Sequence, residues 1–213
     1  MLEMRGFSVS IGRVPVVRDA SLTLKSGEFC GLIGVNGAGK TTLMRGIMGA
    51  LPVSGRLTLD AIDLIRSPSH RRVALGIGYM PEDRRLVPEF TVEQNMLLPS
   101  LSVRIRDLAA RTEWVYRMMP ELDALKGRRA PELSGGQQKL VALARALMAG
   151  WKVLVLDEPF EGLAPALARR LGEVLADLKS HGVTVLISDS KDKHVAGLLD
   201  RTYRIERGII AEA

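Results

Sequence analysis

A glycine-rich segment carries the residues whose types and spacing point most directly to chemistry. Residues 34–42 read GVNGAGKTT and fit the pattern G-x-x-x-x-G-K-[ST]. Glycines let successive backbone N–H groups curve around a phosphate, while the lysine and the hydroxyl suit phosphate oxygens and Mg²⁺. The candidate phosphate-binding residues are Gly34, Asn36, Gly37, Ala38, Gly39, Lys40, Thr41 and Thr42. The segment predicts a site for a nucleoside triphosphate with Mg²⁺, here ATP.

The elements around this segment are those that a phosphate loop requires. An apolar strand is expected over Phe29–Ile33, and a helical run follows over Leu43–Ala50. The partial positive charge at the start of that helix favours an anion. A glycine-rich turn that binds nothing is the alternative, but Lys40 and Thr41 together argue against it.

Two adjacent carboxylates follow a second buried strand. The run Val153–Leu156 is continuously apolar and ends at Asp157 and Glu158. Carboxyl ends of parallel strands meet at one edge of a sheet, beside the phosphate loop. We expect Asp157 to hold Mg²⁺ through water and Glu158 to orient or deprotonate the attacking water. An acidic turn without function is the alternative.

A third motif, LSGGQQ at residues 133–138, precedes the strongly helical stretch Lys139–Ala149. Its candidate binding residues are Ser134, Gly135, Gly136 and Gln137. A serine and glycine amides at a helix start form a second anion site. Two anion sites so far apart in one sequence are explained if each site contacts a different nucleotide. We therefore expect a head-to-tail dimer in which this loop closes on the γ-phosphate held by the partner.

The hydrophobic pattern predicts a single α/β domain over residues 1–213. The expected strands are Leu2–Ile11, Val16–Leu24, Phe29–Ile33, Arg56–Leu59, Ile77–Met80, Val153–Leu156, Val183–Ile187, Thr202–Glu206 and Ile209–Ala211. Short strands bounded by turn residues suggest an antiparallel β flap beside a mostly parallel sheet. Strand signals are absent over residues 91–150, and Thr91 with Gln94 forms a capping box that opens a helix. A helical subdomain is expected over residues 83–150.

The composition limits which partners and which cellular compartment are expected. The net charge is +6 and the isoelectric point is about 9.8, yet basic residues are scattered in pairs and aromatics make up only 4%. Nucleic acid is therefore not expected as a partner. The single Cys30 lies in an apolar run and excludes an internal disulfide. With no membrane-span-length apolar stretch and no leader pattern, we expect a cytoplasmic chain that works on a membrane through a partner.

These motifs make the chain resemble the ATP-binding-cassette (ABC) ATPases over essentially its full length. Residues 78–88 and 157–165 look like the ATPase subunits of branched-chain amino acid importers, and the related urea and amide importers share much of this pattern. The resemblance implies a P-loop NTPase core with ATP and Mg²⁺ as ligands. It also implies a motor on the inner face of the cell membrane that drives permease subunits, fed by a periplasmic or extracellular solute-binding protein.

Three positions depart from the family pattern. The family stacks an aromatic side chain on adenine where this sequence has Ile11, which forfeits roughly 1 kcal/mol of stacking. Glu82 stands where a glutamine senses Mg²⁺ and the permease, a replacement frequent in this importer subgroup. Ser190 stands where a switch histidine contacts the γ-phosphate. His194 lies nearby and is interpreted as a surface histidine.

The replacement at Ser190 predicts slow hydrolysis at this chain's own site, although Glu158 is present. Importers of this subgroup usually pair two different ATPase chains, so the resemblance favours a heterodimer over a homodimer. A hydrolysis-impaired regulatory half of such a heterodimer is an alternative. A cassette ATPase of nucleic-acid metabolism is disfavoured, because such relatives carry long insertions or two cassettes. The apolar residues Val87, Phe90, Leu97 and Leu98 either receive a permease coupling helix or pack the helical insertion.

Overall fold

The computed structural model describes residues 1–191 and 195–213, and its strands form two sheets. The strands are β1 (Leu2–Ile11), β2 (Val14–Leu24), β3 (Phe29–Ile33), β4 (Val53–Leu59), β5 (Ile62–Asp63), β6 (Ile77–Met80), β7 (Val153–Asp157), β8 (Val185–Asp189), β9 (Arg201–Glu206) and β10 (Ile209–Glu212). The smaller sheet is antiparallel with the order β2-β1-β4-β5. The larger has the order β10-β9-β3-β8-β7-β6, and only its β10 edge is antiparallel.

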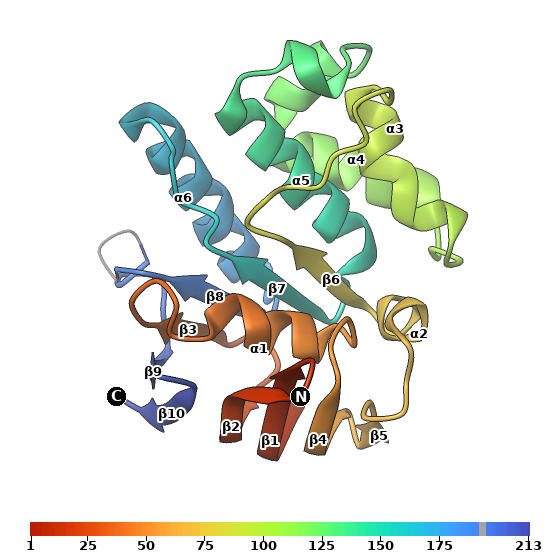
Figure 1. The fold of residues 1–213 in the computed structure, drawn as a ribbon. Helices are drawn as coiled ribbons and strands as arrows, with labels where there is room; N and C mark the ends of the chain where they lie inside the picture. Colours follow the sequence, from red (N-terminus) through yellow and green to blue (C-terminus); the bar gives the residue numbers. More distant parts are fainter. Residues whose placement is uncertain (192–194) are drawn as a thin grey trace.

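Helices fill the connections between these strands. The α-helices are α1 (Lys40–Ile47), α2 (Ser69–Ala74), α3 (Val92–Leu97), α4 (Leu108–Met118), α5 (Gly135–Ala149) and α6 (Pro165–Ser180), with 3₁₀ turns at Leu98–Leu101, Pro120–Leu125 and Ala130–Glu132. Figure 1 shows α1 between the two sheets and α5 and α6 on the opposite face of the larger sheet. This arrangement confirms the predicted α/β fold with an antiparallel flap.

Alternating side chains of the parallel strands divide the core into two clusters. In β3, Phe29 packs with the helices on one face, whereas Cys30 and Leu32 pack with α1 and the antiparallel sheet. Leu154 and Val155 on β7 divide in the same way. The strands buried on both faces read as continuous apolar runs for this reason.

Several predicted strands start or end one to three residues away from the observed boundary, and β8 is shifted at both ends. The end of α6 gives the reason for the shift of β8. The strand expected over Val183–Ile187 is Val185–Asp189. The Val183 amide donates to the Leu178 carbonyl at 3.1 Å and the Gly182 amide donates to the Lys179 carbonyl at 2.9 Å, with Gly182 at φ +69°. Both bonds close the C-terminal end of α6 in a Schellman motif. Val183 therefore belongs to the helix end, and β8 starts and ends two residues after the predicted strand.

The segment of the chain between β6 and β7 forms helices and contains no strand. Thr91 caps α3, and its side chain accepts from the Gln94 amide while Gln94 reaches back, which confirms the predicted capping box. Val87, Phe90, Leu97 and Leu98 were expected either to receive a permease helix or to pack the helical insertion. Of these four, Leu97 packs against the helical core. No helix within residues 1–191 and 195–213 is both long and apolar enough to cross a membrane.

Arg72 is buried beneath the phosphate-loop helix. Its guanidinium donates to the Gly46 carbonyl at 2.9 Å and the Ile47 carbonyl at 2.6 Å, and also to the carbonyls of Leu64 and Ser67. The side chain is 1% exposed. Arg72 therefore satisfies the last carbonyls of α1 and supplies a cation at the negative end of its dipole.

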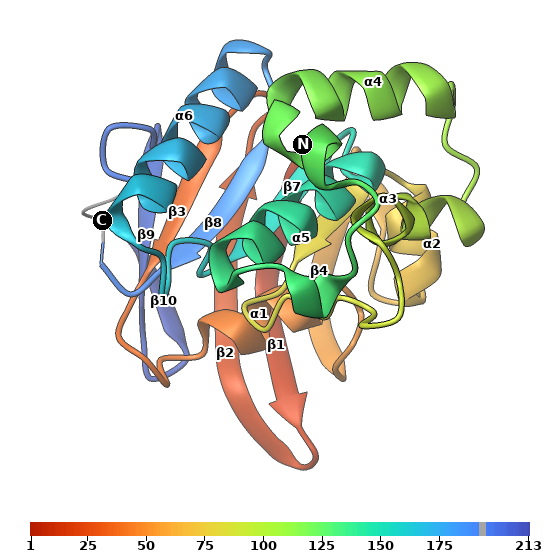
Figure 2. The same ribbon diagram turned by 90° about the horizontal axis from the view of Figure 1, so that it is seen from above.

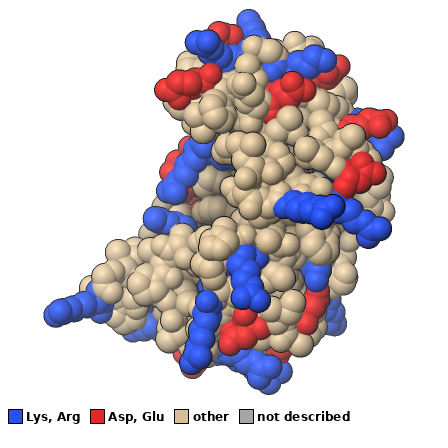
Figure 3. All heavy atoms as spheres, turned by 90° about the vertical axis from the view of Figure 1, so that its right-hand side faces the viewer, with Lys and Arg blue, Asp and Glu red and all other residues tan. Residues whose placement is uncertain are grey.

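Two surface features are plain in the other views. Figure 2 shows the β1–β2 hairpin extending beyond α1, with its tip away from the body of the protein. Figure 3 shows Lys and Arg side chains spread among Asp and Glu on the face that it draws. On that face the basic residues form no continuous block.

Candidate functional site

The predicted phosphate loop encloses the start of α1. A cavity of about 250 Å³ lies over it and is lined by Val16, Asn36, Gly37, Gly39, Lys40, Thr41, Thr42, Glu82 and Glu158. Gly37 and Gly39 adopt φ values of +81° and +112°, which residues with a Cβ rarely adopt. These two conformations turn the loop, and a Cβ added at Gly37 would meet no atom within 4 Å. The cradle is therefore open and lined by backbone, as a phosphate requires.

Lys40 is held at the floor of this cavity by its own loop and by a carboxylate. Its ammonium donates to the carbonyl oxygens of Gly34 and Val35 and lies 3.0 Å from Glu158 Oε1. The side chains of Lys40 and Glu158 are only 3% and 8% exposed. Because both side chains are nearly buried, solvent screens their attraction less than it would at the surface, and the three contacts hold the ammonium group in place.

The backbone of Glu158 is strained and clamped on both sides. Its φ of +45° lies in the left-handed region, which is costly for a residue with a Cβ. The Glu158 amide donates to Ser188 Oγ at 3.0 Å, and Lys139 Nζ donates to its carbonyl at 2.9 Å. These contacts stabilise a turn that aims the Glu158 side chain into the cavity instead of along the strand.

Asp157 ends β7 in a fully buried position. It accepts from Ser188 Oγ at 2.7 Å and from the Tyr79 hydroxyl at 3.3 Å. Burial raises the pKa of Asp157, and hydrogen bonds from Ser188 and Thr41 oppose that rise. Burial beside this carboxylate also raises the pKa of the Tyr79 hydroxyl. Asp157 is thus a desolvated carboxylate, for which a divalent cation is a favourable counterion.

Two exposed carboxylates complete the acidic side of the site. Thr41 Oγ1 donates to Glu82 Oε2 at 3.4 Å. Burial raises the pKa of Glu161, and the neighbouring Glu82 and Glu158 raise it further. The hydroxyl of Thr41 and the carboxylates of Asp157 and Glu82 are hard oxygen donors, which fit Mg²⁺. No group of three His, Cys, Asp or Glu in the described ranges would hold a metal ion by protein ligands alone.

The LSGGQ motif lies at the start of α5 and away from this cavity. Ser134 caps α5, with Ser134 Oγ accepting from the Gln137 amide at 3.3 Å and Gln137 Oε1 accepting from the Ser134 amide at 2.9 Å. Ser134 and Gly135 are exposed. None of the residues from Ser134 to Gln137 lines the cavity over the phosphate loop. Their helix start is free to face another molecule.

Ile11 and Ser190 lie outside the cavity lining, and so do the predicted residues Gly34, Ala38 and Asp157. Ile11 is 51% exposed at the end of the β1–β2 hairpin, and Val16, further along β2, lines the cavity instead. Ser190 follows β8 and does not line it either, although the Gly34 amide donates to the Asp189 carbonyl at 3.2 Å and joins the two segments. His194 lies outside the described residues.

Several residues of the site were missed by sequence reasoning: Val16, Tyr79, Lys139, Glu161 and Ser188. Ser188 and Tyr79 both contact Asp157, but their strands lie far away in the sequence. Lys139 directly follows the LSGGQQ motif, yet nothing in the pattern shows that it reaches Glu158. Glu161 was accessible to sequence reasoning, because it stands three residues after Glu158.

Comparison with known proteins shows to which family the chain belongs. The family model described as ABC transporter matches residues 17–161. The high-affinity branched-chain amino acid transport ATP-binding protein BraG of Pseudomonas aeruginosa is 34% identical, over 99% of this chain and 91% of that protein. The lipopolysaccharide export system ATP-binding protein LptB of Escherichia coli K12 is 36% identical, over 91% of this chain and 81% of its own length.

Solved structures show the same fold. A nucleotide-free ATP-binding cassette from an ABC transporter superposes with a TM-score of 0.87 at 28% identity and covers 100% of this chain and 90% of that one. The ADP conformation of an ATP-binding cassette superposes with a TM-score of 0.85, also at 28% identity, with the same coverage of both chains. The chain therefore belongs to the ABC transporter family and is one of its ATP-hydrolysing, ATP-binding subunits.

Proposed function

We propose that the chain is the motor subunit of an importer for branched-chain amino acids or related small polar solutes. The observation that carries the catalytic part is the meeting of Lys40, Thr41 and Glu158 at one cavity, with Asp157 behind them. The similarity to BraG over 99% of the chain supports the cargo. The motifs at residues 78–88 and 157–165, which resemble those of such importers, support the same assignment.

In this proposal the phosphate loop and Lys40 bind the β- and γ-phosphates of ATP. Thr41, Asp157 and Glu82 hold Mg²⁺, which supplies charge neutralisation to the phosphates when bound. Glu158 orients the attacking water and accepts its proton, because its backbone turn aims the carboxylate into the cavity. Lys40 exchanges part of its contact with Glu158 for contacts with phosphate oxygens.

The LSGGQ loop serves the nucleotide of a second chain. Ser134, Gly135, Gly136 and Gln137 present a helix start and exposed polar groups outside the chain's own cavity. ATP then adds contacts on both chains, so binding favours the closed dimer and hydrolysis with phosphate release reopens it. The resemblance to this importer subgroup favours a heterodimer, with a homodimer as the other possibility.

The cycle of closure and opening moves permease subunits in the membrane. The helical segment over residues 83–150, together with Glu82 at its base, transmits the motion. The working position is the inner face of the cell membrane, and a periplasmic or extracellular solute-binding protein delivers the solute to the permease. The basic residues are scattered in pairs along the sequence, which argues against nucleic acid as a partner.

A second candidate function rests on Ser190. A serine at the position of the switch histidine lacks the imidazole that would contact the γ-phosphate, so this site hydrolyses ATP slowly. The chain would then be the regulatory half of a heterodimer whose other site is catalytically complete. Under this alternative the chain binds ATP but contributes little turnover of its own.

ATP turnover of the purified chain, alone and with its partner subunits, tests both functions. Turnover by the isolated chain that Lys40→Ala and Glu158→Gln each abolish supports the motor. Nucleotide binding without turnover, together with activity that appears only when a partner ATPase is added, supports the regulatory half. Absence of ATP binding contradicts both.

The cargo is tested in cells. Energy-dependent uptake of labelled leucine should fall when the chain is deleted and should return with the wild-type chain but not with Lys40→Ala. Because the chain is also similar to LptB, lipopolysaccharide export should be measured in the same deletion strain. Normal leucine uptake with defective lipopolysaccharide export would contradict the importer assignment.

A further inference from the structure

A second cavity lies at the opposite end of the parallel strands from the phosphate loop. Its volume is about 530 Å³, within the range of small-molecule sites. It is lined by Arg111 and Trp114 from α4, by Trp151 and Lys152 before β7, and by His181 after α6. Strand β7 runs from Val153 at this cavity to Asp157 at the nucleotide site, a path of roughly 13 Å.

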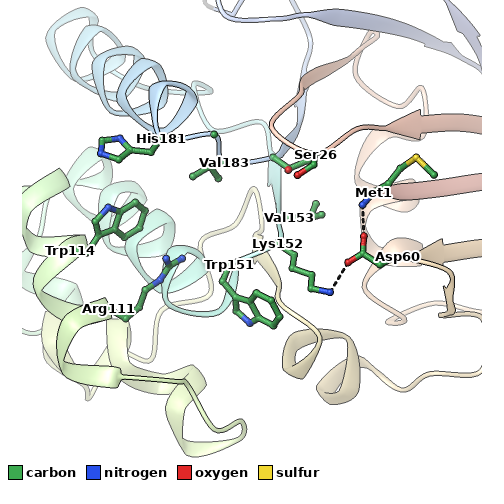
Figure 4. Close-up of a pocket in the computed structure, with 12 residues that line it drawn as sticks. Met1, Ser26, Asp60, Arg111, Trp114, Trp151, Lys152, Val153, His181 and Val183 are labelled. Carbon is green, nitrogen blue, oxygen red and sulfur yellow. Dashed lines mark hydrogen bonds and ion pairs between the residues drawn. The ribbon is translucent and has the colours of Figure 1, made fainter.

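Aromatic side chains line this cavity on two sides. The chain has two tryptophans, Trp114 and Trp151, and both belong to the lining. Trp114 and His181 meet edge to face with ring centroids 6.4 Å apart. Trp151 is 58% exposed, although it is among the largest apolar residues of the chain. Figure 4 shows Trp114 on the α4 side and Trp151 nearer the base of β7.

The charge of the lining is mostly positive. The Arg111 guanidinium stacks 4.4 Å from the centroid of the Trp114 ring. Its Nε donates to the Leu147 carbonyl at 3.0 Å, and its Nη2 donates to the carbonyls of Leu147 and Gly150. Burial lowers the pKa of Arg111, and no carboxylate among the described residues forms an ion pair with it. A desolvated guanidinium without an anionic partner favours an anionic ligand.

The single carboxylate in the lining is already paired. Asp60 lies 2.6 Å from Lys152 Nζ and 2.5 Å from the amino group of Met1, as the dashed lines of Figure 4 show. The hydrogen bond from Lys152 lowers the pKa of Asp60, so it stays ionised without repelling a second anion strongly. Lys152 is also 5.2 Å from the centroid of the Trp151 ring. A cation therefore lies beside each indole.

We propose that this cavity binds a small aromatic carboxylate, with its ring against the indoles of Trp114 and Trp151 and its carboxylate on Arg111 and Lys152. Indole faces complement a flat ring, and Nη1 of Arg111, which makes none of the hydrogen bonds to the end of α5, is the donor for the carboxylate. A purely structural role of Arg111 explains its hydrogen bonds to the carbonyls at the end of α5. It does not explain why the second indole stays exposed beside a second cation.

Tryptophan fluorescence measures this binding directly, because every tryptophan of the chain lies in the cavity. The probe is benzoate, with benzamide as the neutral ring and cyclohexanecarboxylate as the charged ligand without an aromatic ring. We expect a saturable change with benzoate and a dissociation constant on the order of 1 mM, the affinity that a ligand of this size reaches. Each control ligand should bind about tenfold more weakly.

Variants locate the site and separate it from the nucleotide site. Arg111→Met retains the apolar stem and should raise the benzoate dissociation constant about tenfold, and Lys152→Met about threefold. Arg104→Met, at an exposed position, should bind as the wild type. Lys40→Ala should also leave benzoate binding unchanged, so the result does not depend on whether the proposed motor function holds.

Three results would overturn the proposal. One is the lack of a saturable signal up to about 10 mM benzoate, which exceeds the expected dissociation constant about tenfold. Another is equal affinity for benzamide and benzoate. The third is wild-type affinity for benzoate in an Arg111→Met variant whose melting temperature is that of the wild type. If Arg111→Met does not fold, unchanged affinity in Lys152→Met overturns it instead.

Discussion

Lys40 and Glu158 form a buried ion pair, with 3.0 Å between Nζ and Oε1. The pair links the phosphate-binding lysine to the carboxylate that is proposed to act on water. A nucleotide must therefore compete with Glu158 for the lysine. This competition makes affinity and turnover respond to the same carboxylate in opposite directions.

Glu158→Gln should tighten nucleotide binding and stop hydrolysis. The amide removes the negative charge that competes for Lys40, so we expect ATP affinity to rise about threefold to tenfold. Turnover should fall at least about 100-fold, because an amide does not accept the proton of water. Calorimetric titration with ATP and a phosphate-release assay measure the two effects. Glu161→Gln is the matched control, and equal affinity gains in both variants would contradict the argument.

Ser190→His should raise ATP turnover. A histidine at this position restores the imidazole that the family uses, and one such polar contact to the transition state contributes about tenfold to 100-fold. Steady-state phosphate release at saturating ATP is the measurement, and Ser102→His at an exposed position is the control. Wild-type turnover at rates ordinary for the family, with no gain from histidine, would show that the serine is not limiting.

Ser188→Ala should lower both stability and activity. The hydroxyl donates to Asp157 at 2.7 Å and accepts from the Glu158 amide at 3.0 Å, so its loss leaves the buried Glu158 amide without this partner and leaves Asp157 with fewer donors, among them the Tyr79 hydroxyl. We expect a cost of about 1–3 kcal/mol in the free energy of unfolding. Turnover should drop about tenfold, because Glu158 is no longer fixed. Urea unfolding and phosphate release report these effects, and Ser102→Ala should change neither.

Arg72→Met should destabilise the fold without touching the nucleotide site. The buried guanidinium caps the end of α1, and its removal takes away the donor to the Ile47 and Ser67 carbonyls, whereas the Gly46 and Leu64 carbonyls each keep a backbone amide. We expect a loss of about 3 kcal/mol in the free energy of unfolding. Chemical denaturation followed by circular dichroism is the measurement. Arg71→Met, at the neighbouring exposed position, should cost under about 0.5 kcal/mol, and a similar loss in both would refute the capping role.

Cys30 should be inert in the native state and should make the fold sensitive to alkali. Burial raises the pKa of its thiol from 9.0 to about 12. The unfolded thiol ionises first as the pH rises, so the stability from this group is intact below pH 9 and is lost from pH 9 to about 12. Alkylation with iodoacetamide at about pH 8 should proceed only after unfolding. Rapid labelling of the folded protein would contradict the burial.

Local patterns in the sequence predicted the parts of the site that are local in the structure. The loop at residues 34–42 and the pair Asp157–Glu158 depend on a few neighbouring residues, so their motifs suffice. The helix start at the LSGGQQ motif was predicted for the same reason, although the capping contacts of Ser134 were not. These segments needed no knowledge of tertiary packing.

Contacts between distant strands were not predictable from the pattern. Ser188 reaches Asp157 because β7 and β8 pair in parallel with Asp157 opposite Ser188. A two-residue error in the start of β8 hid this register. Arg72 resembled a surface arginine in sequence, since only the three-dimensional structure brings it beneath α1. Single-sequence periodicity carries no information on such pairings.

The separation of the LSGGQ loop from the phosphate cavity has a genetic consequence. If each site combines one chain's Lys40 with another chain's Ser134, defects at the two positions are complementary. If the chain forms a homodimer, a mixture of Lys40→Ala and Ser134→Arg chains would include mixed dimers in which one composite site carries both lesions and the other carries none. Two inactive proteins would thereby restore one working site per mixed dimer.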